Sequence, residues 1–106
     1  MKPVGAYYIQ TDVLLKLGRN QGYNEMMARL VPVMASHGWK LVMALQPMIG
    51  DFRKLTHIWE IAEFDDIRGG LEACAADPAV QAILAPMPEL LETEALTVMV
   101  RTPYAP

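Results

Sequence analysis

The sequence predicts an α+β domain of the βαββαβ type, in which a four-stranded antiparallel sheet carries helices on one face. Three observations lead to this prediction. Strand-like segments alternate with segments of helical periodicity, the two middle strands are joined by only a short turn, and the chain has the length of a single domain. We therefore expect one domain over residues 1–106.

Seven elements are expected along the chain. They are, in order, a strand at 4–15, a helix at 23–36, strands at 39–48 and 55–63, helices at 65–76 and 79–84, and a strand at 94–101. The first strand is predicted because β-branched and aromatic side chains are frequent in it. A cluster of glycine and polar residues at 18–22 then marks a turn.

The first helix is predicted from apolar side chains that recur at steps of three and four between Met26 and Met34. Asn20 or Asn24 could cap its start. Gly38 stands just past its end, where glycine commonly stops a helix. Pro32 removes one backbone donor, so we expect a kink there within a single helix.

The second and third strands are expected to form an antiparallel hairpin across the turn at 49–52. Alternation of side chains assigns one face of each strand. The second strand presents Trp39, Leu41, Met43 and Leu45 together, and the third presents Leu55, His57, Trp59 and Ile61 together.

The second helical region is divided at Asp77-Pro78, because proline suits a first helical position. Asp65-Asp66 is expected to cap the first part, since carboxylates accept free backbone N–H groups and favour the positive end of the helix dipole. Gly69-Gly70 weakens that helix relative to alanine. Pro86 and Pro88 break the second part before the fourth strand begins.

Composition excludes several function classes. Hydrophobic residues make up 53% of the chain, above the usual range of about 45–50%, and a second copy of the chain is the simplest cover for the excess. We therefore expect a homodimer. The net charge is −3 and the basic residues are scattered, which argues against nucleic acid as a partner. No apolar run reaches the length of a membrane span, and Cys74 is the single cysteine, so no membrane partner and a cytoplasmic location are expected.

The third strand carries a His-x-Trp pattern in Leu55-Thr56-His57-Ile58-Trp59-Glu60-Ile61. Arg68 follows in the start of the next helix, and Asp77-Pro78 precedes the one after it. These motifs, in this order, resemble the NIPSNAP family of the dimeric α+β barrel superfamily. Residues 15–18 and 88–94 also fit that family, so the resemblance covers roughly residues 5–100. The resemblance implies ferredoxin-like subunits whose sheets pair across a two-fold axis, and a cavity between each sheet and its helices. Arg53 is a departure, because the family commonly has asparagine in this turn.

His57 is the candidate catalytic residue. It lies mid-strand on the same face as Trp59, and a histidine in an aromatic-lined cavity can exchange a proton near neutral pH. The alternative is a core or interface histidine whose ring nitrogens are satisfied by neighbours. His37 is expected to complement a helix dipole instead. Candidate acid/base partners, if they face inward, are Glu60, Glu63 and Asp12.

Five further residues are candidates for substrate binding. Two tryptophans can stack on a flat ligand, tyrosine hydroxyls can reach a ligand or the histidine, and a methionine can line an adaptable apolar pocket. These candidates are Trp59, Trp39, Tyr8, Met43 and Tyr23. The alternative for each is ordinary packing in the core.

The sequence contains no phosphate-binding glycine loop, nucleophile elbow or metal-ligand pair, so no cofactor and no metal are expected. The leading hypothesis is an enzyme of isomerase, cyclase or monooxygenase type that acts on a small apolar or aromatic metabolite by His-assisted proton transfer. The alternatives are a non-catalytic binding module for a hydrophobic metabolite and a structural or accessory homodimer.

Overall fold

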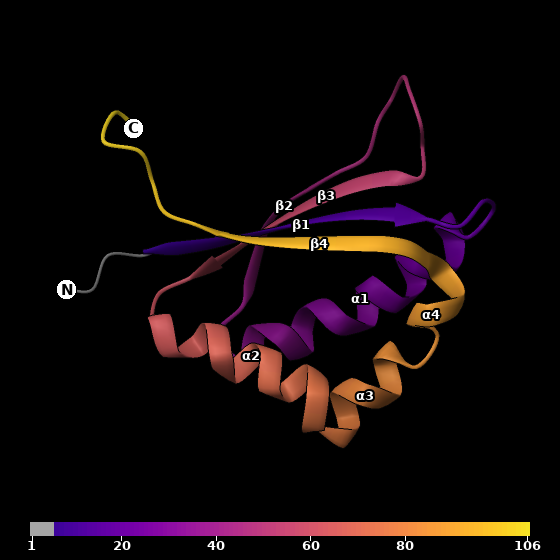
Figure 1. Ribbon diagram of the computed structural model, residues 1–106. Coiled ribbons are helices and arrows are strands. Elements are labelled where there is room, and N and C mark those ends of the chain that lie inside the picture. The colour runs from indigo at the N-terminus through magenta and orange to yellow at the C-terminus, as the bar shows by residue number, and fades with distance from the viewer. Residues whose placement is uncertain (1–5) are drawn as a thin grey trace.

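The structure is a computed structural model in which residues 6–106 are described. Its elements are β1 (Tyr7–Leu15), α1 (Asn20–Ser36), β2 (Lys40–Leu45), β3 (Lys54–Ile61), α2 (Phe64–Ala76), α3 (Pro78–Leu84), α4 (Met87–Leu90) and β4 (Leu91–Met99). The strands form one antiparallel sheet in the order β2-β3-β1-β4, and the helices cover one of its faces (Figure 1). This confirms the predicted α+β fold. The part of the first expected strand at residues 4 and 5 lies outside the described residues.

Helix α1 begins three residues earlier than predicted. Arg19 is its N-cap residue and makes no side-chain capping bond. Asn20, one of the two expected caps, instead donates its Nδ2 hydrogen to the carbonyl oxygen of Phe52 at 2.8 Å and so ties the helix start to the β2–β3 turn. The helix continues through Pro32 to Ser36, and Gly38 follows with a φ of +85°, as expected of a glycine that ends a helix.

The hairpin of β2 and β3 contains a one-residue bulge. Leu41 lies opposite Trp59, but the next paired residue, Met43, lies opposite Ile58, so Val42 is an extra residue in β2. The predicted shared face of Leu41 and Met43 is therefore wrong, because adjacent residues of β3 point to opposite sides of the sheet. The predicted face of β3 is confirmed, since all four of its members are buried.

Glu63 occupies the N-cap position of helix α2 without a side-chain capping hydrogen bond, and the aspartates predicted to cap this helix lie in its first turn. Within it, Gly70 has a packing reason, because a Cβ atom added there would overlap the indole ring of Trp39. Asp77 caps α3 as expected, accepting the backbone N–H of Ala79 at 2.9 Å. Helix α4 was not predicted, because Pro86 and Pro88 were expected to end the helical region. A proline is tolerated in the first turn of a helix, where its missing N–H has no partner to lose, so α4 forms with Pro88 in that turn.

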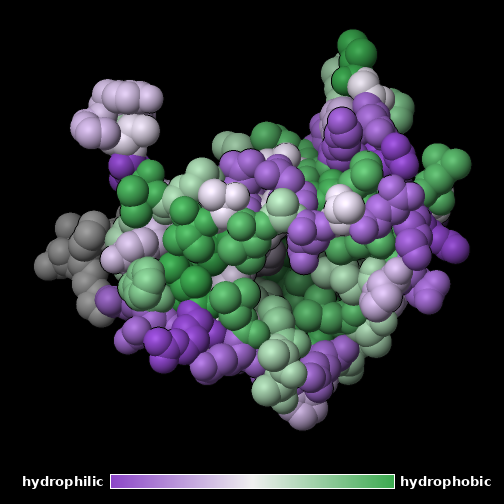
Figure 2. All heavy atoms as spheres, viewed as in Figure 1, coloured by the Kyte–Doolittle hydropathy of each residue, from purple (hydrophilic) through white to green (hydrophobic). Residues whose placement is uncertain are grey.

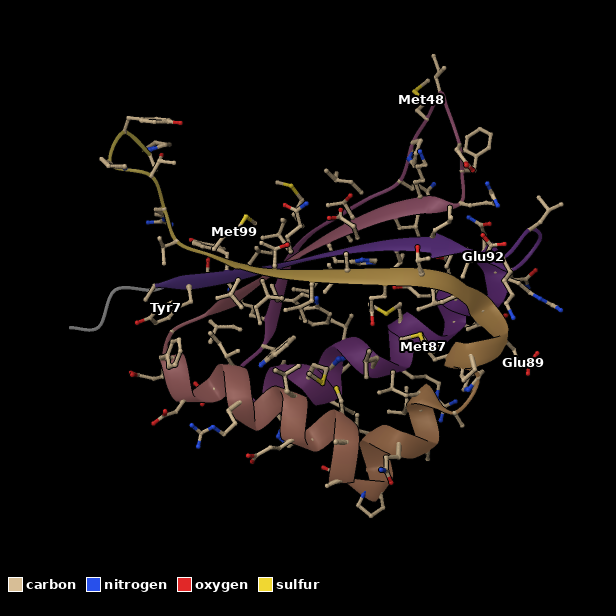
Figure 3. All side chains as sticks on the ribbon, in the orientation of Figure 1. Tyr7, Met48, Met87, Glu89, Glu92 and Met99 are labelled. Carbon is tan, nitrogen blue, oxygen red and sulfur yellow. The ribbon has the colours of Figure 1, made fainter. Side chains whose placement is uncertain are left out.

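The two faces of the sheet differ in their cover. On the helix side, β1 and β3 present mainly buried apolar residues: Tyr7, Ile9, Val13, Leu15, Leu55, Trp59 and Ile61, together with Thr11 and His57. The opposite side carries no helix, and there the exposed residues include Met43 and Leu45. Figure 3 shows Tyr7 directed toward the helices and Met99 toward the uncovered side. None of the helices in residues 6–106 is long and apolar enough to cross a membrane.

Candidate functional site

His57 lies in the middle of β3 and points into the space between the sheet and α1. Its side chain is 5% exposed, and its Nδ1 atom has no hydrogen-bond partner among the described residues. Burial lowers the pKa of His57, an effect that the backbone hydrogen bond with Thr11 and the charge of Asp12 only partly oppose. The ring is therefore neutral at pH 7 and keeps a nitrogen that can accept a proton.

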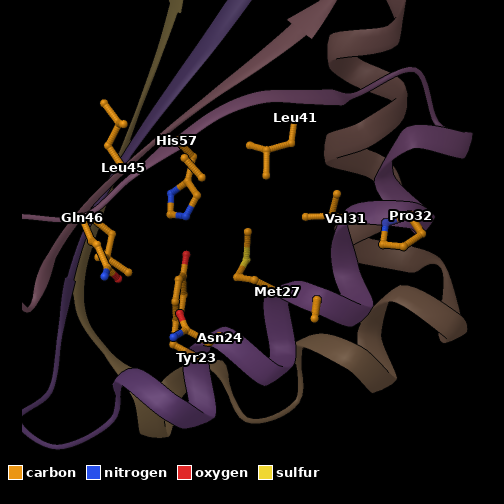
Figure 4. Close-up of a pocket in the computed structure, with 12 residues that line it drawn as sticks. Tyr23, Asn24, Met27, Val31, Pro32, Leu41, Leu45, Gln46 and His57 are labelled. Atoms are coloured by element: carbon orange, nitrogen blue, oxygen red, sulfur yellow. The ribbon is translucent and has the colours of Figure 1, made fainter.

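Tyr23, in the first turns of α1, is the aromatic neighbour of His57. The two ring centroids lie 5.9 Å apart, and Figure 4 shows the hydroxyl of Tyr23 directed toward the imidazole. Burial raises the pKa of Tyr23, and the negative charge of Glu94 raises it further. The hydroxyl consequently stays protonated at neutral pH, where it can donate a hydrogen bond.

A cavity of about 480 Å³ opens between α1 and the β2–β3 edge of the sheet, with His57 and Tyr23 in its wall (Figure 4). Its other lining residues are Asn24, Met27, Ala28, Val31, Pro32, Leu41, Ala44, Leu45, Gln46 and Leu55. Ala44 lies opposite His57 because of the bulge at Val42. A volume of this size, lined mostly by apolar side chains with a few polar groups, is typical of small-molecule sites.

A second cavity of about 390 Å³ lies on the other side of Tyr23, toward β4 and the helices α2, α3 and α4. Figure 2 shows the surface hollowed between β4 and these helices, with hydrophobic side chains around the hollow. Tyr23 and Met27 line both cavities. Glu94 lines this second one, where burial raises the pKa of its carboxyl group.

The two predicted tryptophans lie in the second cavity rather than beside the imidazole. Trp39 and Trp59 pack edge to face with their ring centroids 5.9 Å apart. Trp39 also donates its indole hydrogen to the carbonyl oxygen of Asp66 at 2.7 Å, which fixes its position. Of the five candidates for substrate binding, the structure thus brings Tyr23 to His57 and places both tryptophans one cavity away.

Tyr8 and Met43 lie on the uncovered side of the sheet. Tyr8 pairs with Glu60 and Met99 and packs under the guanidinium group of Arg101, 5.6 Å from the ring centroid. Met43 lies opposite Ile58 and is 50% exposed. Neither residue lines the two cavities beside Tyr23. For Met43 the reason is the bulge, which sequence alternation does not reveal.

The candidate acid/base partners named from the sequence also lie elsewhere. Asp12 and Glu60 point to the uncovered side, where Asp12 accepts hydrogen bonds from Gln10 and Thr56. Glu63 lies at the N-cap position of α2. His37 follows the end of α1, as expected, and lies 3.4 Å from Asp77.

The structure adds two polar residues that sequence reasoning missed. Glu94 and Thr11 face the helices, and a signal for Glu94 existed, because alternation in β4 places it on the same side as Leu96 and Val98. Within residues 6–106, no group of three or more histidine, cysteine, aspartate or glutamate residues is arranged to hold a metal ion.

Comparison with known proteins decides the family. The NIPSNAP family model matches residues 14–106. The chain belongs to the NIPSNAP family. The resemblance to the NIPSNAP family seen in the sequence is thereby confirmed.

Solved NIPSNAP structures share the fold. A NIPSNAP family protein with unknown function from Agrobacterium tumefaciens is 24% identical, with a TM-score of 0.80 over 94% of this chain and 91% of that chain. A second NIPSNAP family protein from that organism is 20% identical, with a TM-score of 0.80 over 94% and 96% of the two chains. An uncharacterized NIPSNAP domain protein from Burkholderia xenovorans is 15% identical, with a TM-score of 0.77 over 94% and 98%. No curated protein matches the chain.

Proposed function

We propose that this NIPSNAP protein is a small-molecule enzyme that binds a largely apolar molecule beside His57 and moves a proton without a separate cofactor. The observation that carries the proposal is His57 itself, which lines the cavity and whose buried Nδ1 atom lacks a partner in the described structure. Leaving a buried polar atom unpaired costs about 1–3 kcal/mol, so a ligand that supplies the partner gains that interaction. A neutral imidazole is also the form that acts as a general base.

Tyr23 supplies the complementary group. When a base removes a proton next to a carbonyl group, negative charge develops on the carbonyl oxygen, and a hydrogen-bond donor in a dry cavity stabilises that charge strongly. The protonated hydroxyl of Tyr23, directed toward His57, is such a donor. The pair therefore suits proton transfer at a carbon atom next to a carbonyl group.

Binding without turnover is the second candidate. The observation that favours it is the remaining lining of the His57 cavity, in which apolar side chains predominate and the polar groups are the amides of Asn24 and Gln46. Amides orient a ligand by hydrogen bonding but do not exchange protons at neutral pH. A carrier or sensor of a hydrophobic metabolite would have such a wall.

We also propose that the protein acts as a homodimer through the uncovered side of the sheet. Met43 and Leu45 are 50% and 56% exposed there, and Ile58 lies beside them on the same face. Stable dimer interfaces bury a patch of this apolar kind on both partners.

Native mass spectrometry of protein prepared gently in extract of its own host tests binding and assembly together. We expect the mass of two chains plus a reproducible small adduct. Ala44→Trp fills the His57 cavity and should remove the adduct while the dimer persists. Met43→Glu, one residue along but on the opposite face, should separate the dimer. An adduct that survives Ala44→Trp would place the ligand elsewhere and contradict the proposal.

His57→Asn separates the enzyme from the carrier. It keeps a polar, though smaller, side chain that can form hydrogen bonds but removes the basic nitrogen. For an enzyme, turnover of the captured molecule should fall by about 100-fold or more, because general base catalysis typically contributes that much. For a carrier, no product appears with either protein and binding weakens only modestly.

A further inference from the structure

The two cavities beside Tyr23 share a wall and differ in their titratable groups. Tyr23 and Met27, one turn apart on α1, line both cavities and so stand between them. His57 lines the first cavity and Glu94 lines the second. Tyr23 is 3% exposed and fixed in place, whereas Met27 is only partly buried, so a rotation of its flexible side chain would join the two cavities.

A polar strip crosses the sheet beneath this wall. Thr11 and His57 are the buried polar residues of the described core, at 8% and 5% exposed, and they pair directly across β1 and β3. Glu94 lies beside Val13, two residues along β1 from Thr11, and faces the helices as Val13 does. With strands about 4.8 Å apart and a rise of about 3.4 Å per residue, the Cα atoms of His57 and Glu94 are about 12 Å apart. A small molecule spans that separation once the two side chains reach toward it.

We propose that the two cavities form one ligand site divided by Tyr23, and that Glu94 is the second proton-transfer group of this site, opposite His57. The ligand class is a mainly apolar β,γ-unsaturated carbonyl compound, whose enolate is conjugated with a C=C bond. The inference rests on the proposed function and extends it by naming the acid that the His57 cavity lacks.

The directions of the pKa shifts of His57, Glu94 and Tyr23 agree with these roles. Burial lowers the pKa of His57 and raises that of Glu94, which favours a neutral base at one end of the site and a protonated acid at the other. Glu94 also acts on its surroundings, because its charge raises the pKa of Tyr23 and of Cys74. The carboxyl group therefore lies close enough to Tyr23 for the two groups to influence each other.

The proton balance closes without an oxidant or a cofactor. His57 accepts the proton as a C–H bond of the ligand breaks, and the electron pair moves to the carbonyl oxygen, where the hydroxyl of Tyr23 donates a hydrogen bond. The carboxylic acid of Glu94 then gives its proton to the γ-carbon of the resulting dienolate, which forms the new C–H bond, moves the C=C bond into conjugation and restores the carbonyl group. His57 afterwards releases its proton and Glu94 regains one through solvent. The net reaction is an isomerisation.

Glu94→Gln tests the geometry, with Glu92→Gln as the matched control on the same strand. Tyrosines labelled at Cζ are titrated by NMR, and Tyr23 is assigned with Tyr23→Phe. We expect Glu94→Gln to lower the pKa of Tyr23 and Glu92→Gln to leave it unchanged. An unchanged pKa in Glu94→Gln would overturn the inference, whatever the fate of the proposed function. Both substitutions preserve side-chain size, and circular dichroism checks the fold.

Isomerisation of 3-cyclohexenone to 2-cyclohexenone in D₂O, followed by ¹H NMR, tests the chemistry, because exchange of the α-hydrogens needs the base alone whereas the shift of the C=C bond also needs the acid. We expect the wild-type protein and Glu92→Gln to accelerate isomerisation equally, and Glu94→Gln and His57→Asn each to slow it by about 10-fold or more. Isomerisation that is lost in His57→Asn but retained in Glu94→Gln overturns the inference and leaves the proposed function standing. No acceleration of isomerisation by the wild-type protein, or none lost in His57→Asn, counts against the proposed function itself.

Discussion

Two regions on the helix side of the sheet are equally buried and differently built. The Trp39 region comprises Trp39 with Asp66 and Gly70 of α2, and the His57 region comprises His57 with Tyr23 and Ala44. Trp39 is 4% exposed and His57 is 5% exposed. The indole N–H of Trp39 donates to a carbonyl oxygen, and Gly70 leaves no spare room against the ring. Nδ1 of His57 has no partner in the described residues, and an alanine and a cavity lie beside it.

The difference separates stability from function. A buried polar group with a partner contributes to folding, while one without a partner lowers stability and persists where a ligand can use it. The free energy of unfolding should therefore change strongly on substitutions in the Trp39 region and weakly on substitutions in the His57 region. Four stability measurements test this contrast.

Gly70→Ala should have the largest effect. The new Cβ atom would overlap the Trp39 indole, so the ring must shift and weaken its hydrogen bond to Asp66. We expect the free energy of unfolding in urea to fall by about 2–3 kcal/mol. Gly69→Ala is the matched control, because nothing lies within 4 Å of its added atom. It should raise stability by about 0.5–1 kcal/mol through helix propensity. Equal effects at both positions would contradict the tight packing of the Trp39 region.

Acidification should reveal the second largest effect. Because burial lowers the pKa of His57 in the folded protein below the usual histidine value of about 6.5, the unfolded chain binds a proton first as the pH falls. Stability should therefore drop from pH 7 to pH 5, by at most about 2 kcal/mol from this residue, the limit set by protonation of the unfolded histidine. Glu94, whose pKa is raised, contributes with the opposite sign.

Urea unfolding at both pH values isolates the contribution of His57 when the wild-type protein is compared with His57→Leu. The drop should be smaller in the variant, since Glu94 is present in both proteins. An identical drop would show that His57 titrates in the folded protein as it does in the unfolded chain.

Trp39→Phe should come third. It removes the indole N–H that reaches Asp66 while keeping an aromatic ring in the core. We expect a loss of about 1–2 kcal/mol, from one hydrogen bond and part of the buried ring. Thermal or urea unfolding measures it. No loss would mean that the hydrogen bond of the Trp39 region carries no net stability.

His57→Leu should have the smallest effect on stability at pH 7. Leucine replaces an unpaired buried nitrogen with an apolar group, so the free energy of unfolding should stay within about 1 kcal/mol of the wild-type value, on the more stable side. Urea unfolding at pH 7 measures the change. A loss larger than that would make His57 a structural residue and remove the contrast between the two regions.

The sequence predicted the fold well where local patterns repeat without interruption. Alternation in β3 identified the buried face that holds His57, because that strand pairs regularly with β1. Asp77 and Gly38 identified helix limits, since each satisfies a local backbone requirement. The order of elements then left little choice of topology.

The candidate site was predicted only in part, since it depends on contacts between distant segments. His57 and Tyr23 are 34 positions apart and meet only through packing of α1 on the sheet. The bulge at Val42 depends on pairing with β3 and leaves no mark in the alternation of β2. Glu94 went unnoticed because a carboxylate at a strand start is usually solvated, and only the packing of β4 beside the helices brings it to the second cavity, where partial burial of the carboxyl group raises its pKa.

The bulge at Val42 also has an evolutionary meaning. In a regular strand the residue opposite His57 would be Met43, whose long side chain would occupy the space that Ala44 leaves free. One added residue therefore converts a filled core position into a chamber, although the neighbouring side chains keep their identity. A lineage can gain or lose such a chamber by insertion or deletion of a single codon, so in related chains the length of this strand deserves comparison before its residue types.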